Sequence, residues 1–252
     1  MMFLTILHTM EGENSASNII LAGRRSAVQG KRCRNEYNRV PMTSILDRYQ
    51  RIAPLYDLLD FPFEHGRYRH IRPQLFHELS GRILDAGVGT GRNIAHYPAS
   101  ASVVGIDLSP AMLARAERRA HQIDRAVDLR QMDVTHLDLP DQSFDAAVAS
   151  FLFCVLPDEL QVPALVELER VLKPRATLRL LEYVRPTGTL RAFIAQLWEP
   201  WMAWAYGAGF DRRTEEHVIE AGLEILDSRF VVDDLIKLIS VRARPTGERR
   251  PT

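Results

Sequence analysis

The chain has 252 residues, a length that suits one large α/β domain, and its 46% hydrophobic and 25% charged residues are the balance of a globular protein. Basic and acidic residues both number 32, so no net charge draws the chain toward nucleic acid. Its two cysteines, Cys33 and Cys154, are far apart, which excludes a disulfide framework and a paired-cysteine zinc site. We therefore expect no metal, no nucleic-acid partner and a reducing, cytoplasmic location.

Residues 1–41 show neither helical nor strand periodicity and carry a cluster of arginine and lysine. We expect them to be disordered, or to be a mis-annotated extension of a protein that begins at Met42. Residues 42–245 are expected to form a single domain, and residues 246–252 a tail. No run of 18 apolar residues without charges occurs, so no membrane-spanning helix is expected.

Apolar residues recur at helical spacing in residues 45–59 and 69–79, which predicts two helices at the start of the patterned region. Short apolar strands then alternate with helices. The strands are predicted at residues 82–86, 102–107, 127–131, 144–150 and 176–184, and the helices between them at residues 92–97, 110–123 and 161–172. The helices at residues 190–208 and 214–222 and the strands at residues 223–230 and 235–242 complete the chain. Serial β-α-β order gives a parallel sheet with helices on both faces.

A glycine-rich turn, LDAGVGTG, follows the first predicted strand at residues 84–91. Glycines there let a ligand lie against bare main chain, although a tight strand-to-helix connection explains them as well. The second strand ends in Asp107, where Rossmann folds bind the ribose hydroxyls of a nucleotide; the alternative is a cap for the next helix. Asp133 follows the third strand and suits an adenine amino group, or is a solvated loop acid.

Together these segments resemble the class I S-adenosylmethionine (SAM) dependent methyltransferases over residues 49–184. The matching segments are LDAGVGTG, VVGIDLSPAMLARA, MDVTHLDLPDQSFDAAVAS and LVELERVLKP. The resemblance extends to methyltransferases of quinone biosynthesis, of phosphatidylethanolamine and of thiols. It implies a Rossmann-like three-layer sandwich with a mostly parallel seven-stranded sheet and an antiparallel last strand, plus N-terminal helices and a helical insertion near residues 190–222. It also implies SAM as the cofactor.

The same resemblance assigns the cofactor site. It implies that Asp85, Gly87, Gly89 and Gly91 surround the methionine part of SAM, that Asp107 binds its ribose, and that Met132 and Asp133 flank its adenine. Further candidate cofactor contacts are Ala86, Leu108, Met112 and Ser150. One departure is that the family usually has two glycines where this chain has Arg175 and Ala176. We therefore predict that this turn avoids dihedral angles that only glycine favours.

The glycine spacing argues against the alternative of an NAD-dependent oxidoreductase. Dinucleotide sites use G-x-G-x-x-G to seat a pyrophosphate on a helix N-terminus, whereas this turn has G-x-G-x-G with Asp85 two residues before it. A carboxylate there repels a pyrophosphate but suits a ligand with an ammonium and a sulfonium. A SAM-binding module without catalytic activity stays open as a second alternative.

The segment after the fourth strand, residues 150–155, is almost wholly apolar. Ligands of open α/β sheets bind outside the carboxyl ends of the strands, so this segment should face the methyl group and suits a lipophilic acceptor. Packing against the next helix explains it equally well. Candidate catalytic residues are Tyr56, in a segment similar to the cofactor-covering region of quinone and phospholipid methyltransferases, His65 and Cys154. The structural alternatives are core packing for Tyr56 and Cys154 and a solvated face for His65.

All three tryptophans, Trp198, Trp201 and Trp204, lie at spacing of three in one predicted helix. Such a stripe suits peripheral contact with the inner face of a membrane or an apolar lid, with core packing as the alternative. The sequence thus predicts an enzyme that methylates a small or lipophilic acceptor. Thiol sulfur and phospholipid amine are the leading acceptors, and a quinone ring carbon is the third.

Overall fold

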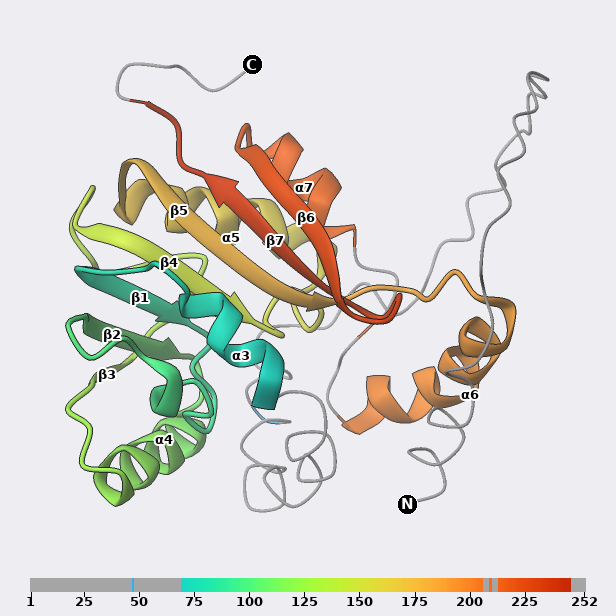
Figure 1. Cartoon of the computed structure of the whole chain (residues 1–252), viewed down its shortest axis with the longest axis horizontal. Coiled ribbons are helices and arrows are strands. Elements are labelled where there is room, and N and C mark those ends of the chain that lie inside the picture. The colour runs from blue at the N-terminus through green and yellow to red at the C-terminus, as the bar shows by residue number, and fades with distance from the viewer. Residues whose placement is uncertain (1–46, 48–68, 206–208, 210–212, 246–252) are drawn as a thin grey trace. The chain divides into compact units, whose positions relative to one another are not determined.

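The computed structural model describes residues 47, 69–205, 209 and 213–245, and these form one seven-stranded sheet with helices (Figure 1). The strands are β1 (Arg82–Ala86), β2 (Ser102–Asp107), β3 (Asp128–Gln131), β4 (Phe144–Ser150), β5 (Leu172–Tyr183), β6 (Glu224–Val232) and β7 (Ile236–Arg242). Their order across the sheet is β3-β2-β1-β4-β5-β7-β6. Strands β1 to β5 pair in parallel, and β7 pairs antiparallel with both β5 and β6. The predicted mostly parallel sheet with an antiparallel last strand is confirmed.

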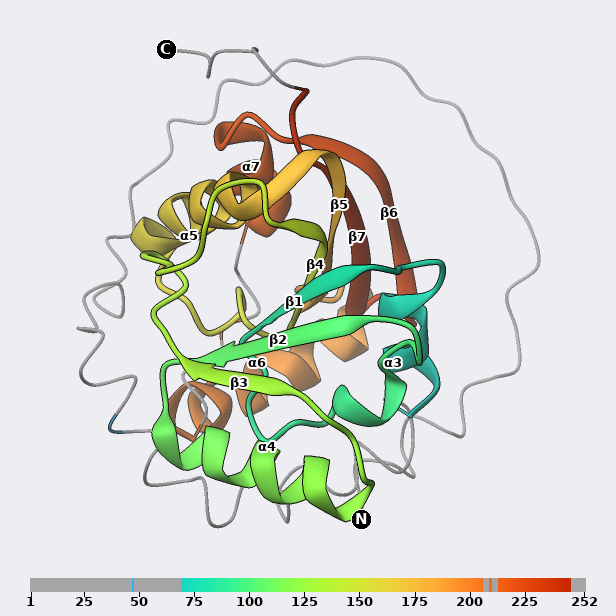
Figure 2. The same cartoon turned by 90° about the vertical axis from the view of Figure 1, so that its left-hand side faces the viewer.

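Helices cover both faces of this sheet (Figure 2). The helices of the described residues are α3 (Arg69–Phe76), the 3-10 helix η2 (Ile94–His96), α4 (Pro110–Gln122), α5 (Asp158–Val171), α6 (Thr189–Ala205) and α7 (Thr214–Glu220), and those that contribute to the two cores are α3, η2, α4, α5 and α7. Successive side chains of a strand point to opposite faces, so β1 contributes to two cores. Leu84 belongs to the core that contains Leu168 of α5, whereas Ile83 belongs to the core that contains Leu75 of α3. This two-sided burial explains why the parallel strands are continuous apolar runs.

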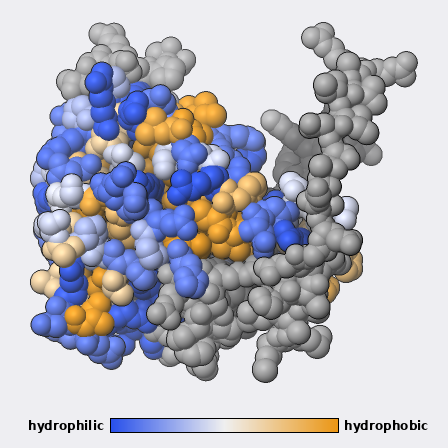
Figure 3. Space-filling view, viewed as in Figure 1, coloured by the Kyte–Doolittle hydropathy of each residue, from blue (hydrophilic) through white to orange (hydrophobic). Residues whose placement is uncertain are grey.

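Predicted elements outside the described ranges are the tail at residues 1–41, the helix at residues 45–59 apart from Asp47, and the tail at residues 246–252. Among the residues that the structure describes, no helix combines the length and the apolar composition needed to cross a membrane. The face seen in Figure 3 is mostly hydrophilic, with hydrophobic side chains gathered in separate patches. Large hydrophobic side chains that are exposed include Ile123, Phe193, Leu197, Ile219, Leu226 and Phe230.

The helix predicted at residues 92–97 is wrong in type, because only one 3-10 turn forms there. Tyr97 takes an extended conformation, with φ −62° and ψ 136°, since the following Pro98 disfavours helical geometry in the residue before it. The apolar spacing of this short segment could not reveal that stop. The turn keeps Asn93 and Tyr97 close to the end of β1, where both contact Asp85.

The prediction that residues 175 and 176 avoid glycine-like dihedral angles is also wrong. Arg175 has φ 63°, in the left-handed region, although its side chain is exposed and carries a β-carbon. The main chain holds it there, since its N–H donates to the carbonyl of Ala243 at 3.2 Å and the Ala243 N–H donates to Ala176 at 2.9 Å. Pairing with the end of β7 therefore overrides the local preference of the arginine.

We predict that Arg175→Gly stabilises the protein by about 1 kcal/mol, because glycine adopts a left-handed conformation without the clash that a β-carbon causes. Urea denaturation of the purified chain measures the change. Arg175→Ala is the matched control, since it removes the side chain but keeps the β-carbon, and it should give no gain. Equal stability of the glycine and alanine variants would contradict the strain argument.

Candidate functional site

The glycine turn after β1 depends on backbone conformations that glycine favours. Gly87, Gly89 and Gly91 have φ of 72°, 56° and 80°. A β-carbon on Gly91 would lie 2.9 Å from the Cα of Ala116, so this glycine lets the turn pack against α4. A β-carbon on Gly89 would meet only the Gly87 carbonyl, at 3.9 Å. The middle of the turn therefore leaves open backbone for a ligand.

Asp107, at the end of β2, fixes both this turn and the start of α4. One carboxylate oxygen accepts from the N–H of Gly89 at 2.9 Å, and the other accepts from the N–H of Ser109 at 2.8 Å. The helix cap itself is Ser109, whose hydroxyl accepts from the N–H of Met112, so the alternative of Asp107 as the cap is wrong. Burial raises the pKa of Asp107 to about 6, against the lowering effect of the two backbone hydrogen bonds.

Asp85 is fully buried behind the turn, at the end of β1. The Tyr97 hydroxyl donates to it at 2.6 Å, and the Asn93 amide nitrogen lies 3.1 Å and 3.2 Å from its two oxygens. Arg72 of α3 in turn donates to the Asn93 amide oxygen at 2.7 Å. Desolvation raises the pKa of Asp85 to about 6, although these hydrogen bonds favour its charged form.

Sequence reasoning did not predict that Arg72, Asn93 and Tyr97 gather around Asp85. Only Arg72 carried a signal, because it is a charged residue beside Ile71 on the apolar side of a predicted helix, where an unpaired charge is costly. It is 5% exposed and is paired inside the network. Ser150, a predicted cofactor contact, accepts from the Asn93 amide at 3.0 Å and so joins the same cluster.

The structure brings the predicted adenine-side residues to the same edge of the sheet. The N–H of Met132 donates to the Asp107 carbonyl at 3.1 Å. Leu108, the residue after Asp107, is half-buried. One oxygen of Asp133 accepts from the N–H and the hydroxyl of Thr135, at 2.8 Å and 2.7 Å. Met112 is 1% exposed, so its side chain lies in the core. The cofactor roles of these residues stay predictions.

The loop after β4, residues 151–156, contacts the glycine turn, because a β-carbon on Gly87 would lie 3.0 Å from the Leu152 side chain. Its first residue, Phe151, has φ 56°, a conformation that costs a non-glycine residue about 1 kcal/mol or more. The centroid of the Phe151 ring lies 4.9 Å from that of the Tyr183 ring and 5.7 Å from the guanidinium carbon of Arg72. Tertiary contacts therefore stabilise a strained loop beside the turn.

Glu182 of β5 binds the main chain of this loop. Its fully buried carboxylate accepts from the N–H groups of Leu152, Phe153 and Cys154 at 3.0, 2.9 and 2.9 Å. Burial raises its pKa to about 7, although these N–H groups favour the charged form. The sequence offered a usable signal, because Glu182 interrupts an apolar strand. We interpret it as the residue that sets the position of the loop.

A second clamp holds the carbonyl groups of the same loop. The side-chain amide of the buried Gln161 donates to the carbonyls of Phe153 and Leu156 at 3.1 Å and 3.3 Å, and Nδ1 of His217 lies 2.9 Å from its oxygen. Cys154 is 1% exposed, and its thiol donates to the Phe151 carbonyl at 3.3 Å. The predicted residues Tyr56 and His65 lie outside the described residues, as do the side chains of the three tryptophans.

Comparison with known proteins adds independent findings. Residues 83–175 match the family described as "Methyltransferase domain". A phosphatidylethanolamine N-methyltransferase from Cereibacter sphaeroides is 34% identical over 145 residues, which are 56% of this chain and 70% of that protein. A ubiquinone/menaquinone biosynthesis C-methyltransferase from Syntrophotalea carbinolica is 39% identical over 153 residues, 57% of this chain but only 63% of that protein.

Two solved structures share the fold at low identity. The [4+2]-cyclase SpnF has a TM-score of 0.63 at 19% identity, with 81% of this chain and 96% of that chain covered. A geranyl diphosphate methyltransferase in complex with SAM has a TM-score of 0.57 at 13% identity, with 70% and 84% covered. At this identity the likeness concerns the arrangement of strands and helices alone.

We predict that the unfolding temperature falls as pH rises from 5.5 to 7.5. Because the folded-state pKa values of Asp85, Asp107 and Glu182 lie above those of ordinary carboxyl groups, the folded state binds more protons than the unfolded state in this range. Stability is therefore lost as pH rises through about 6 to 7. Thermal denaturation followed by circular dichroism measures the slope.

Asp85→Asn should reduce this pH-dependent loss by about 1 kcal/mol, since it removes one of the three titrating groups. Asp128→Asn is the control, because an exposed pairing with Arg130 lowers the pKa of Asp128 and keeps it charged over this range. An unchanged slope in Asp85→Asn would show that the Asp85 carboxyl does not titrate there.

We predict that Asp107→Asn weakens the binding of SAM and of S-adenosylhomocysteine about 30-fold or more. The change replaces a charged acceptor of hydrogen bonds by an amide that accepts through only one of its atoms, which costs about 2 kcal/mol or more. Calorimetric titration measures both affinities, with Asp128→Asn as the matched surface control. Unchanged binding of both ligands would remove Asp107 from the cofactor site.

Proposed function

This chain belongs to the SAM-dependent methyltransferases, and we propose that its acceptor is the amine of a phospholipid head group. Membership of this family argues against the alternative of an NAD-dependent oxidoreductase. The choice among amine, thiol and quinone carbon is the proposal, and it stands on the apolar surface of α6 and the apolar loop after β4.

The described residues fit SAM. The open backbone at Gly89 offers a cradle, and two carboxylates with unfavourable burial, Asp85 and Asp107, suit a ligand with a net positive charge. In this proposal Asp107 binds the ribose, Met132 and Asp133 flank the adenine, and Asp85 acts through the glycine turn and its electric field. When bound, SAM would supply an electrophilic methyl group on its sulfonium: a new nitrogen–carbon bond would form to an unprotonated amine, the carbon–sulfur bond would break, and the neutral thioether would leave.

The protein's part in such a reaction is to align the two reactants and to exclude water. The loop at residues 151–156 is suited to both tasks, since it is apolar, contacts the glycine turn and is clamped by Glu182 and Gln161. Tyr56 and His65 remain proposed acceptor-side residues. For the buried Cys154 we propose that its thiol shapes this loop through the Phe151 carbonyl.

The observation that carries the lipid acceptor is the exposed apolar face of α6. Phe193 is 65% exposed and Leu197 is 70% exposed, and they lie four residues apart, on the same face of the helix. A helix that presents large apolar side chains to solvent is suited to the interface of a bilayer. The positions of Trp198, Trp201 and Trp204 in the same helix extend the proposal to peripheral membrane contact. The phosphatidylethanolamine N-methyltransferase among the relatives supports the amine.

We predict that the purified chain transfers labelled methyl groups from SAM to vesicles containing phosphatidylethanolamine. Phe193→Glu with Leu197→Glu should lower this rate at least tenfold, because charge on this face opposes insertion, while a dispersed short-chain phosphatidylethanolamine reacts at an unchanged rate. Ile219→Glu is the matched control, since Ile219 of α7 is 65% exposed but lies outside α6.

Methylation of a demethylated quinol or of a small thiol, with none of the phospholipid, would overturn the proposed acceptor. Binding of SAM without methylation of any of the three would favour the non-catalytic module. Equal rates of the α6 variant and the wild type on vesicles would show that the apolar face of α6 is not needed to reach the lipid acceptor.

A further inference from the structure

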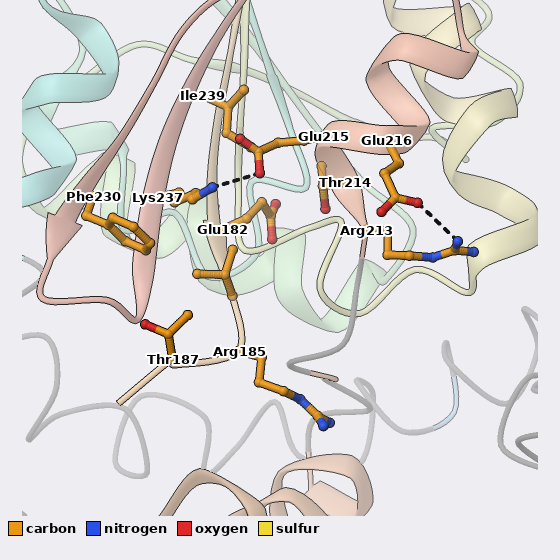
Figure 4. Close-up of a pocket in the computed structure, with 11 residues that line it drawn as sticks. Glu182, Arg185, Thr187, Arg213, Thr214, Glu215, Glu216, Phe230, Lys237 and Ile239 are labelled. Atoms are coloured by element: carbon orange, nitrogen blue, oxygen red, sulfur yellow. Dashed lines mark hydrogen bonds and ion pairs between the residues drawn. The ribbon is translucent and has the colours of Figure 1, made fainter. Parts of the chain in front are cut away.

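A cavity of about 500 Å³ lies where β5 ends, β7 begins and α7 starts (Figure 4). The residues that matter for its chemistry are Glu182, Arg185, Arg213, Glu215, Phe230 and Lys237. It lies at the same edge of the sheet as the glycine turn, because β5 runs parallel to β4 and β1, and β7 runs antiparallel to β5. None of the predicted cofactor contacts lines this cavity.

Charges of both signs line the cavity. The side chains of Arg185, Arg213 and Glu216 are 58%, 59% and 67% exposed, whereas those of Lys237 and Glu215 are 21% and 36% exposed. The carboxylate of Glu182 is fully buried, and Figure 4 shows it between the Lys237–Glu215 and Arg213–Glu216 pairs. A ligand with a single charge would meet side chains of the same sign, whereas a zwitterion can meet both signs.

The floor of the cavity is joined to the reaction site through one loop. Glu182 is one of the lining residues, and its fully buried carboxylate accepts from the N–H groups of Leu152, Phe153 and Cys154. The Leu152 side chain in turn lies against Gly87 of the glycine turn. A ligand group that reaches the floor therefore lies against the same loop that borders the cofactor turn.

We propose that this cavity binds the zwitterionic head group of the phospholipid acceptor, with the phosphate at Arg185 and Arg213 and the amine directed inward toward Glu182. This inference rests on the proposed function and names the subsite that it needs. Arginine suits the phosphate because its guanidinium donates two hydrogen bonds to neighbouring oxygens. The carboxylates that line the cavity favour binding of the cationic amine over a hydroxyl, and the bound amine must then give its proton to a carboxylate or to water before it can accept a methyl group.

The proposed orientation of the head group places the acyl chains toward α6. The acyl chains of a phospholipid are attached on the phosphate side, so they must leave through the mouth of the cavity. Arg185, at that mouth, pairs with Glu199 of α6 at 3.2 Å. The same helix carries the exposed Phe193 and Leu197, which supply an apolar surface for the chains.

The test is calorimetric titration of glycerophosphoethanolamine into the full chain saturated with S-adenosylhomocysteine. Arg185→Gln and Arg213→Gln should each weaken its binding about tenfold, as expected for the loss of a charge-assisted hydrogen bond. Arg229→Gln is the matched control, since Arg229 is also exposed and paired but lies outside the cavity. Glycerophosphoglycerol, which has the phosphate without the amine, should bind at least tenfold more weakly than glycerophosphoethanolamine.

The outcomes separate the two proposals. Absence of glycerophosphoethanolamine binding, equal affinity of all three variants, or equal binding of the two probes would overturn the head-group site, even where phosphatidylethanolamine vesicles are methylated. The expected binding pattern without methylation of those vesicles would overturn the proposed function and leave the head-group site standing. Retained affinity for S-adenosylhomocysteine shows that each variant is folded.

Discussion

The rest of this structure depends on the burial of one carboxylate, Asp85, beneath the glycine turn. A buried charge is tolerated only where hydrogen bonds replace water, and Tyr97 and Asn93 supply them here. Those donors require the short 3-10 turn after the glycines, and Asn93 requires Arg72 from α3. The raised pKa of Asp85 shows that this compensation is incomplete. A cationic cofactor bound at the glycine turn would therefore stabilise the charged form of the Asp85 carboxyl.

The same principle governs the acceptor side. Phe151 holds a strained conformation, and the peptide groups after it would be buried without partners if Glu182 and Gln161 were absent. Glu182 comes from β5, about 30 residues away, whereas Gln161 lies in α5 just after the loop and contacts His217 of α7, 56 residues further along the chain. Because Glu182 also lines the cavity, one side chain connects the proposed head-group site with the loop that borders the cofactor turn.

Much of the fold could be predicted because it follows from local patterns. Three strands, β1, β2 and β4, have the predicted bounds, since parallel strands buried on both faces are continuous apolar runs between polar turns. The glycine motif and Asp107 at the end of the second strand were visible in the sequence, and the resemblance to the methyltransferase family predicted their cofactor roles. Residues 92–97 and Arg175 failed because there a proline and a neighbouring strand decided the backbone conformation against the local preference.

The sequence by itself determined the sheet, its helices and the glycine turn, because hydrophobic periodicity and glycine spacing act over a few residues. Only the tertiary structure decided which polar side chains meet inside the core. Arg72, Asn93 and Glu182 act through partners up to 78 residues away, and such partners leave no periodic signal. Likewise the cavity at the end of β5 exists only because β7 returns antiparallel and carries Lys237 to Glu215 of α7. Long-range pairing of charges is a property of the folded chain, since it is the sheet order that makes them neighbours.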